Sequence, residues 1–193
     1  MPKDHAKTER FMRHLEPLQG ALESYCRRSL RDRNAIADVL QSAVGNAFRD
    51  FHLYAEGSNF RAWIFRYVHL EIQNWNRKHD RTKHEELPAE LAVEDAWELA
   101  LNEPLFKVLL DDPEAVLDQC DAALAQAIGD LATVERAVLL LHGIGEFKYR
   151  EIAEILQVPI GTVMGSLARC RLRLRQQLVE YGAELRLLKP EER

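Results

Sequence analysis

The chain has 193 residues, 47% of them hydrophobic and 30% charged, and this composition is typical of a folded protein rather than a disordered or collagen-like chain. Its length allows one medium domain or two small ones, and its net charge of −5 is unusual for a free-standing DNA-binding protein. No stretch reaches the roughly 18 apolar residues that cross a bilayer, and the polar start lacks a secretory signal, so we expect a cytoplasmic protein without membrane insertion.

The charged residues divide the sequence into three segments. Residues 1–84 carry fifteen Lys and Arg against ten Asp and Glu, residues 85–121 carry one against twelve, and residues 122–193 carry ten against nine. This pattern predicts two small domains, 1–84 and 122–193, joined by an acidic linker at 85–121.

In the first segment, Asn34 can cap a helix that runs to about Phe51, and the Gly57–Asn59 turn precedes a second helix that begins near Phe60. The second helix has one polar stripe, made of Arg66, His69, Gln73, Asn76 and Arg77.

Eight of the fifteen aromatic residues lie within residues 48–75, beside this stripe. Aromatic rings next to a basic stripe are suited to single-stranded nucleic acid. The alternative is that the rings form the core, and we favour it for Trp63, Phe65 and Tyr67. Tyr54, in the turn, is the better candidate for an exposed ring.

In the last segment, Asp112 and Pro113 can begin a helix that runs to Gly129, and Thr133 can cap a helix that ends at Gly143. Two more helices are predicted at 149–156 and 161–180, separated by Gln157, Val158 and Pro159. Strand signals are weak throughout, so the predicted fold class is all-α.

The last two predicted helices have the spacing of a helix-turn-helix motif. The second of them has an apolar side, and about 120° away a polar side made of Thr162, Ser166, Arg169, Arg173 and Gln176. Such a helix can enter the major groove of DNA. The alternative is an ordinary amphipathic surface helix with solvated arginines.

Four segments resemble the extracytoplasmic-function (ECF) sigma factors of bacterial RNA polymerase. Residues 151–163, EIAEILQVPIGTV, resemble the family's EIAEILGVPVGTV, and residues 131–141 resemble LPPREREVLLL. Nearer the start, residues 37–41 resemble EDLVQ and residues 59–66 resemble SFRTWLYR. Both groups of motifs in this order are far more specific than the helix-turn-helix alone.

The resemblance implies a sigma region 2-like helical bundle and a region 4-like helix-turn-helix domain, with core RNA polymerase and promoter DNA as partners. Asp38 and Gln41 would dock on the polymerase. The residues implied in −10 DNA binding are Tyr54, Ser58, Asn59, Arg61, Arg66, His69, Gln73 and Arg77. Those implied in −35 DNA binding are Thr162, Met164, Ser166, Arg169, Arg171 and Arg173. An anti-sigma protein is a further partner that the resemblance leaves open.

This sequence departs from the family where DNA is read. After the GTV motif the family usually has basic or polar residues, as in KSRLHRAR, whereas Met164, Gly165 and Ser166 stand here. In the −10 helix His69 and Leu70 replace the usual Arg-Asn pair, and Gln157 replaces the glycine of the turn. We therefore expect weak or atypical reading of the −35 element.

Two other functions remain open from the sequence. One is a helix-turn-helix regulator that acts without polymerase docking, and the other is a sigma-like adaptor that binds polymerase but reads promoters weakly. A phosphate-binding glycine loop, a nucleophile elbow and paired metal ligands are all missing from the sequence, so we expect no enzyme, catalytic residue, cofactor or metal site. Cys26, Cys120 and Cys170 are far apart and are expected to be reduced.

Overall fold

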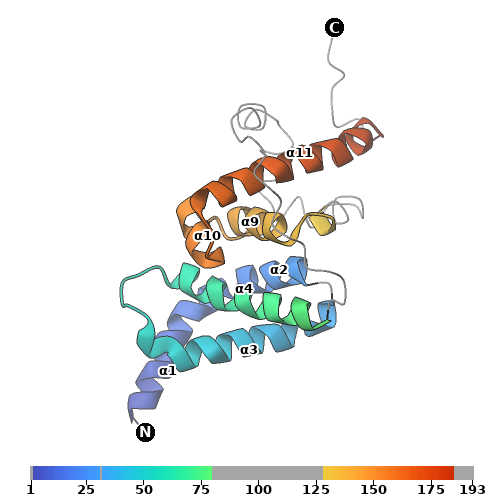
Figure 1. Ribbon diagram of the computed structural model, residues 1–193. Helices are drawn as coiled ribbons and strands as arrows, with labels where there is room; N and C mark the ends of the chain where they lie inside the picture. The colour runs from blue at the N-terminus through green and yellow to red at the C-terminus, as the bar shows by residue number, and fades with distance from the viewer. Residues whose placement is uncertain (1, 31, 80–127, 185–193) are drawn as a thin grey trace. The chain divides into compact units, whose positions relative to one another are not determined.

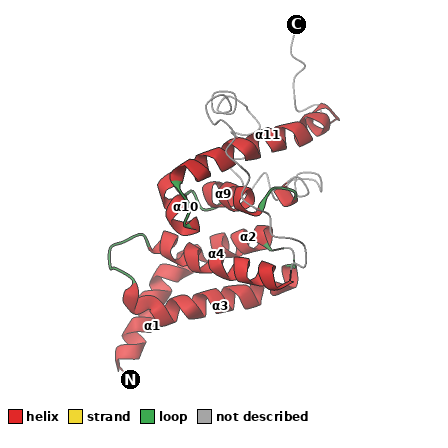
Figure 2. Cartoon of the chain, in the orientation of Figure 1, coloured by secondary structure: helices red, strands yellow, loops and turns green. Residues whose placement is uncertain are grey.

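The computed structural model describes residues 2–30, 32–79 and 128–184, and within this part of the chain the elements are helices without strands (Figure 2). The predicted all-α class is confirmed. The predicted acidic linker and the predicted helix start at Asp112 lie outside the described residues. The helices of residues 2–79 and those of residues 128–184 are described separately below.

The N-terminal part has four α-helices, coloured blue to green in Figure 1: α1 (Pro2–Leu15), α2 (Gln19–Ser29), α3 (Ile36–Arg49) and α4 (Phe60–His79). Short 3-10 turns connect them at Glu16–Leu18, Arg33–Ala35 and Asp50–Leu53. α3 lies alongside α4, and α2 packs against both. The sequence patterns predict α3 and α4 but neither α1 nor α2.

The helix α3 begins one residue later than predicted, with Ala35 rather than Asn34 at the cap position. Asn34 is not its cap, because the carboxylate of Asp32 accepts a hydrogen bond from the Asn34 N–H at 2.9 Å and holds a 3-10 turn there. The predicted start of α4 at Phe60 is confirmed, and the oxygen of the Asn59 side chain accepts a hydrogen bond from the Ala62 N–H at 3.0 Å. Asn59 is therefore the side chain that caps α4.

The core of the N-terminal part is a cluster of aromatic rings around Phe11 of α1. The Phe11 ring lies edge-on to Phe48 and Phe51, each at 5.2 Å between centroids, and to Phe60 at 5.8 Å. Edge-to-face ring pairs at these separations are favourable beyond the area that they bury. The predicted core role holds fully for Phe65, whereas Trp63 and Tyr67 are only half-buried.

The C-terminal part contains α9 (Thr133–Gly143), α10 (Tyr149–Leu156) and α11 (Ile160–Glu184), which confirms the three predicted helices (Figure 1). Thr133 is not a cap, because the N-cap position is Ala132 and no side chain caps the helix. Gln157, in the turn between α10 and α11, has a φ angle of 56°. This left-handed conformation explains why the resembling family has glycine there.

Candidate nucleic-acid and polymerase interfaces

The outer face of α3 carries the two residues expected to dock on polymerase. Asp38 and Gln41 are both exposed, three residues apart on one side of the helix. The opposite side is buried through Val39, Ala43 and Ala47, whose spacing of four residues follows the helical repeat. The apolar side thus fixes the orientation of α3 and leaves the polar pair accessible.

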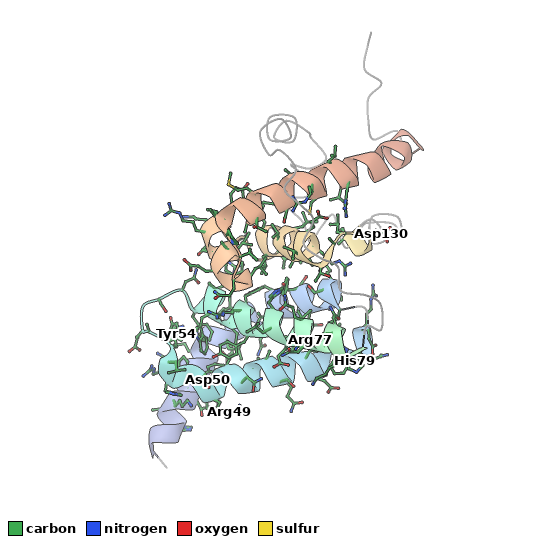
Figure 3. The ribbon with its side chains drawn as sticks, in the orientation of Figure 1. Arg49, Asp50, Tyr54, Arg77, His79 and Asp130 are labelled. Atoms are coloured by element: carbon green, nitrogen blue, oxygen red, sulfur yellow. The ribbon has the colours of Figure 1, made fainter. Side chains whose placement is uncertain are left out.

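The turn between α3 and α4 corrects the expectation for Tyr54, labelled in Figure 3. Its side chain is only 9% exposed, and its ring stacks on Phe51 at 5.6 Å with 7° between the planes. Its hydroxyl donates a hydrogen bond to the Ser58 carbonyl oxygen at 2.7 Å. The Tyr54 side chain therefore packs against the loop that follows it, and its ring is not exposed for stacking on a base.

The segment from Ala55 to Asn59, which Tyr54 supports, is exposed and forms a hydrogen-bonded turn. The Ser58 hydroxyl and its N–H both bond to the Ala55 carbonyl oxygen, at 2.7 and 3.0 Å. Gly57 has a φ angle of 85°, a conformation that glycine adopts at little cost. Leu53, which no sequence pattern singled out, is 69% exposed and lies two residues before this turn.

The helix α1 holds the same loop from another side. The imidazole of His14 stacks on Phe60 at 4.9 Å, and Arg10 forms an ion pair with Glu56 at 3.5 Å. Because the ion pair is exposed, it contributes little, and the rings are the stronger restraint. The exposed loop is thus supported by rings from α1, from the 3-10 turn Asp50–Leu53 and from α4.

The polar stripe expected on α4 divides into two lines of residues. Arg66, Gln73 and Arg77 are exposed, as predicted, but His69 is only 5% exposed. His69 Nδ1 shares a hydrogen bond with the Tyr25 hydroxyl at 2.8 Å, and Asn76 donates to the Ser29 carbonyl oxygen at 3.3 Å. Both partners belong to α2, so His69 and Asn76 face α2 and His69 is not an exposed DNA-binding residue.

Burial sets the protonation state of the groups at this contact. The pKa of His69 falls from 6.5 to about 4, because burial disfavours the charged imidazolium. The ring is therefore neutral at pH 7 and adds no positive charge to the surface of α4. Burial likewise raises the pKa of the neighbouring Cys26 thiol to about 12, so this thiol stays protonated.

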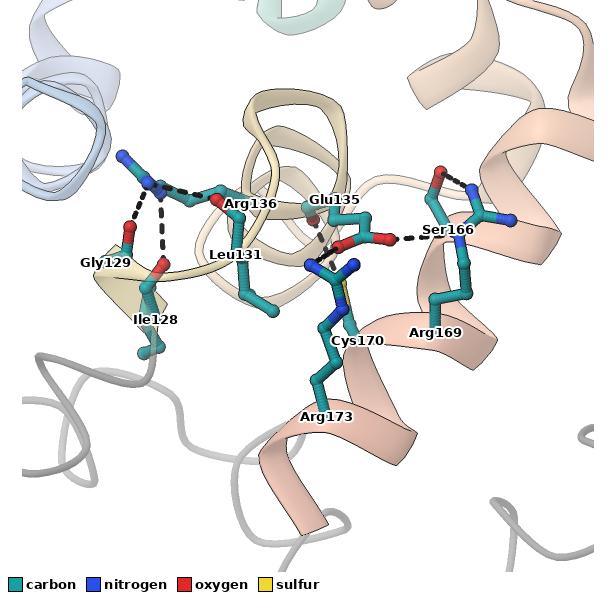
Figure 4. A network of polar contacts seen from close by, with 9 residues as sticks. All are labelled: Ile128, Gly129, Leu131, Glu135, Arg136, Ser166, Arg169, Cys170 and Arg173. Carbon is teal, nitrogen blue, oxygen red and sulfur yellow. Dashed lines mark hydrogen bonds and ion pairs between the residues drawn. The ribbon is translucent and has the colours of Figure 1, made fainter. Parts of the chain in front are cut away.

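A buried glutamate on α9 pairs with two arginines of α11, the predicted recognition helix. Glu135 is 1% exposed; its Oε1 accepts a hydrogen bond from Arg169 Nε at 2.9 Å, and its Oε2 forms an ion pair with Arg173 Nη1 at 3.1 Å (Figure 4). The side chain of Arg169 is 16% exposed and that of Arg173 46%. Arg169 is thus turned toward α9, and Arg173 keeps only part of its surface free.

Ser166 is also held inside the C-terminal part. It is fully buried, and its hydroxyl oxygen lies 3.2 Å from Arg169 Nη2. Because a buried hydroxyl is not presented to a base edge, Ser166 is not part of the exposed surface of α11. Thr162 and Met164 are half-buried. The structure does not describe the side chain of Arg171.

Glu135 is not among the site residues expected from the sequence. The available signal was a glutamate on the helical side that also carries Val138 and Leu139, since a buried acid needs a cationic partner. In the same network Arg136 donates to the carbonyl oxygens of Ile128 at 3.0 Å and Leu131 at 3.1 Å, and also to that of Gly129 (Figure 4).

Three further properties hold for the described part of the chain. No group of three or more His, Cys, Asp and Glu residues in it could hold a metal ion. Cys26 and Cys170 are buried and form no disulfide bond. None of the described helices combines the length and the apolar character that a membrane span requires.

Two family models match the chain in the order that the resemblance requires. Residues 14–82 match sigma-70 region 2, and residues 121–174 match sigma-70 region 4. The first match includes α2, α3 and α4, and the second includes α9, α10 and most of α11. The described helix pattern therefore agrees with both models.

Curated relatives span most of the chain. The RNA polymerase sigma factor YlaC of Bacillus subtilis is 25% identical over 166 residues, covering 85% of this chain and 89% of its own. The ECF RNA polymerase sigma factor SigW of the same organism is 29% identical, covering 79% and 80%. The RNA polymerase sigma-E factor of Streptomyces coelicolor is 27% identical, covering 95% and 94%.

Solved structures share the fold. The sigma factor RpoE of Bartonella quintana, solved in complex with the anti-sigma factor NepR, superposes with a TM-score of 0.65 at 21% identity, covering 89% of this chain and 98% of its own. CnrH, solved with the cytosolic domain of CnrY, gives a TM-score of 0.61 at 21% identity, covering 90% of both chains. With both sigma-70 regions matched and ECF factors among its relatives, the chain belongs to the ECF group of the sigma-70 family.

Proposed function

We propose that this sigma factor docks on core RNA polymerase through the outer face of α3 and opens promoters at the −10 element with the loop before α4. The observation that supports this most strongly is the pairing of two features. Asp38 and Gln41 are presented on a helix whose other side is buried, and the exposed turn of residues 55–59 is braced by aromatic packing.

In this proposal the braced turn receives a base that leaves the duplex. Extruding a base costs a few kcal/mol, and a preformed loop recovers part of that cost because it does not have to be ordered first. Ser58 and Asn59 offer polar groups at the turn, and Arg61 and Arg66 follow on the first turns of α4. Tyr54 and His69 act by supporting this surface from inside.

The C-terminal helix-turn-helix is proposed to dock on the −35 element through α11. Of the residues that the resemblance implies in −35 binding, Thr162 and the free part of Arg173 remain together on the polar side of α11 that was expected to meet DNA. Because Glu135 holds Arg169, this helix has fewer free cations than its sequence suggests, and we expect a shallow −35 preference.

The partners follow from the relatives, which are named as RNA polymerase sigma factors. Core RNA polymerase and promoter DNA are the proposed partners, and the protein would meet them in the cytoplasm. An anti-sigma protein is a further proposed partner, because the structurally similar RpoE was solved with one. We assign no catalytic step, cofactor or metal to this chain.

The docking face is tested with Asp38→Arg combined with Gln41→Ala. The double variant should lose at least about tenfold in its ability to displace labelled wild-type protein from core polymerase, since a reversed charge at the centre of an interface is repelled. Circular dichroism should show an unchanged helix content, because both side chains are exposed.

The matched control is Glu16→Arg combined with Gln19→Ala. It makes the same chemical changes three residues apart at another exposed place, at the start of α2. The control should displace labelled protein normally. Normal displacement by the Asp38 and Gln41 variant would contradict the proposed docking face.

A specific observation favours one second candidate, a polymerase adaptor that reads promoters weakly. Ser166 is fully buried and Arg169 is paired with Glu135, so neither side chain is freely available to contact the −35 element. Selection from a promoter library with the holoenzyme separates the two functions. A −10 consensus favours the sigma factor proposal, and a pool without any consensus favours the adaptor.

A further inference from the structure

One line of four exposed residues runs along α4. Arg66, Leu70, Gln73 and Arg77 are spaced by four, three and four residues, so at 100° per residue they fall within an arc of about 60°. All four are exposed, and Leu70 is 44% exposed. The sequence pattern placed His69 in this line, but its contact with Tyr25 of α2 turns it away and leaves Leu70 at the centre.

The charges of this line fit nucleic acid. Arg66 and Arg77 lie eleven residues apart, which is roughly 16 Å along a helix at 1.5 Å per residue. Arg77 lies toward the opposite end of α4 from the loop that contains Tyr54 (Figure 3). Two cations that flank a short apolar and amide-bearing segment can contact phosphates while the segment between them meets bases.

Leu70 offers this line an apolar group with no hydrogen-bonding capacity. Among the four DNA bases, thymine alone presents a methyl group, at C5, and apolar side chains recognise it by contact. Gln73, one turn further on, has a carboxamide that can donate to and accept from a base edge. The pair is therefore suited to a step that contains thymine.

We propose that Leu70 is a specificity-determining residue that contacts the C5 methyl group of a thymine in the −10 element. Arg66 and Arg77 hold the flanking phosphates, and Gln73 contacts the adjoining base. This inference rests on the proposed function of α4 in −10 binding. It gives a role to Leu70, which stands where the family usually has asparagine.

The test replaces each thymine of a selected −10 element in turn with deoxyuridine, which lacks only the methyl group. With wild-type holoenzyme, one position should weaken binding by about fourfold, the effect of burying one methyl-sized group. With Leu70→Ala holoenzyme, thymine and deoxyuridine at that position should bind equally. Leu70→Met, which restores an apolar side chain of similar size, should recover the preference for thymine.

Leu172→Ala is the matched control, because Leu172 is an exposed leucine on α11, 52% exposed. It should leave the deoxyuridine effect unchanged. The proposal is overturned when wild-type and Leu70→Ala holoenzymes show the same sensitivity at every position. It is also overturned when Leu70→Ala weakens binding to core polymerase instead, which would make Leu70 a protein-contacting residue.

A second variant separates this inference from the proposed function. Arg66→Ala combined with Arg77→Ala should reduce the slope of log binding constant against log salt by about two, one for each lost phosphate contact. A changed slope with no methyl effect from Leu70 would overturn the inference alone. An unchanged slope would show that this face of α4 does not contact DNA. Both the inference about Leu70 and the proposed −10 function of α4 would then fail.

Discussion

His69 shows how one buried contact changes the use of a whole helix face. On a helical wheel it lies about 60° from Arg66, so the sequence alone assigns it to the polar stripe. The hydrogen bond to Tyr25 instead makes it part of the bundle. Its place on the exposed line is taken by Leu70, whose exposure the sequence pattern did not predict.

The buried imidazole makes stability depend on pH in a defined window. Since the pKa of His69 is about 4 in the folded protein and 6.5 when unfolded, the unfolded chain binds a proton first as pH falls. Folding is therefore weakened from about pH 6.5 down to about pH 4. Between pH 7.5 and pH 5 the expected loss from this residue is about 2 kcal/mol.

Urea unfolding of the wild type and of His69→Gln at the two pH values measures this effect. Tryptophan fluorescence is a suitable signal, because Trp63 and Trp75 lie on α4. The wild type should lose about 2 kcal/mol more than the variant on acidification, since glutamine does not titrate. Equal losses would show that His69 is protonated as readily in the folded state as in the unfolded chain.

In the C-terminal part, Glu135 is the buried polar residue whose contacts we expect to affect stability, as His69 is in the N-terminal part. Glu135→Gln keeps the shape but removes the charge that Arg169 and Arg173 share, so the partly buried Arg169 is left without its counter-ion. We expect a loss of about 2–4 kcal/mol in stability, seen as a lower melting temperature. Glu154→Gln, an exposed acid on α10, should change little, and equal melting temperatures for both would contradict the role of Glu135.

At the scale of elements, the turn between α9 and α10 depends on Gly145. A Cβ atom there would lie 2.5 Å from the Leu141 carbonyl oxygen and would collide with the Phe147 ring. Backbone oxygen cannot move aside cheaply, so Gly145→Ala should destabilise the C-terminal part by about 1–3 kcal/mol.

Thermal unfolding of Gly145→Ala beside Gly45→Ala provides the comparison. A Cβ at Gly45, within α3, meets nothing within 4 Å, so alanine there should stabilise by about 0.5–1 kcal/mol through helix propensity. Opposite shifts of the melting temperature are expected. A Gly145→Ala protein as stable as the wild type would mean that the turn rearranges at no cost.

Helices with a strong apolar repeat between turn-forming residues were predictable. The helix α10 was placed at its observed ends, because Ile152 and Ile155 mark one face and the Gln157–Pro159 turn stops it. The helix α1 was missed because it is highly charged and its buried hydrophobic residues are Phe11 and Leu15. Its stability comes from ring contacts with residues distant in sequence, which no local pattern contains.

The candidate surfaces were predictable as faces but not residue by residue. Asp38, Gln41, Arg66 and Arg77 are exposed, as expected for contact with a partner. Tyr54, His69 and Ser166 are buried because tertiary packing covers them: His14 of α1 lies beside Tyr54, Tyr25 of α2 lies beside His69, and α9 packs against α11, which carries Ser166. A wheel diagram gives the direction of a side chain but not which neighbour covers it.

Charge limits what the free protein can do. The chain carries a net charge of −5, and the twelve Asp and Glu in residues 85–121 would repel DNA near either domain. The cations available for phosphate contact are further reduced by the pairing of Arg169 with Glu135. Promoter binding by this sigma factor should therefore require the polymerase, which adds contacts and positions both domains.

The most direct measurement compares the free chain with the reconstituted holoenzyme on the same promoter duplex at the same salt concentration. The holoenzyme should bind specifically, and tighter than the free chain by about two orders of magnitude or more. The free chain should bind promoter and unrelated duplex about equally weakly. Tight, sequence-specific binding by the free chain, unchanged on addition of core polymerase, would contradict the account and identify an independent helix-turn-helix regulator.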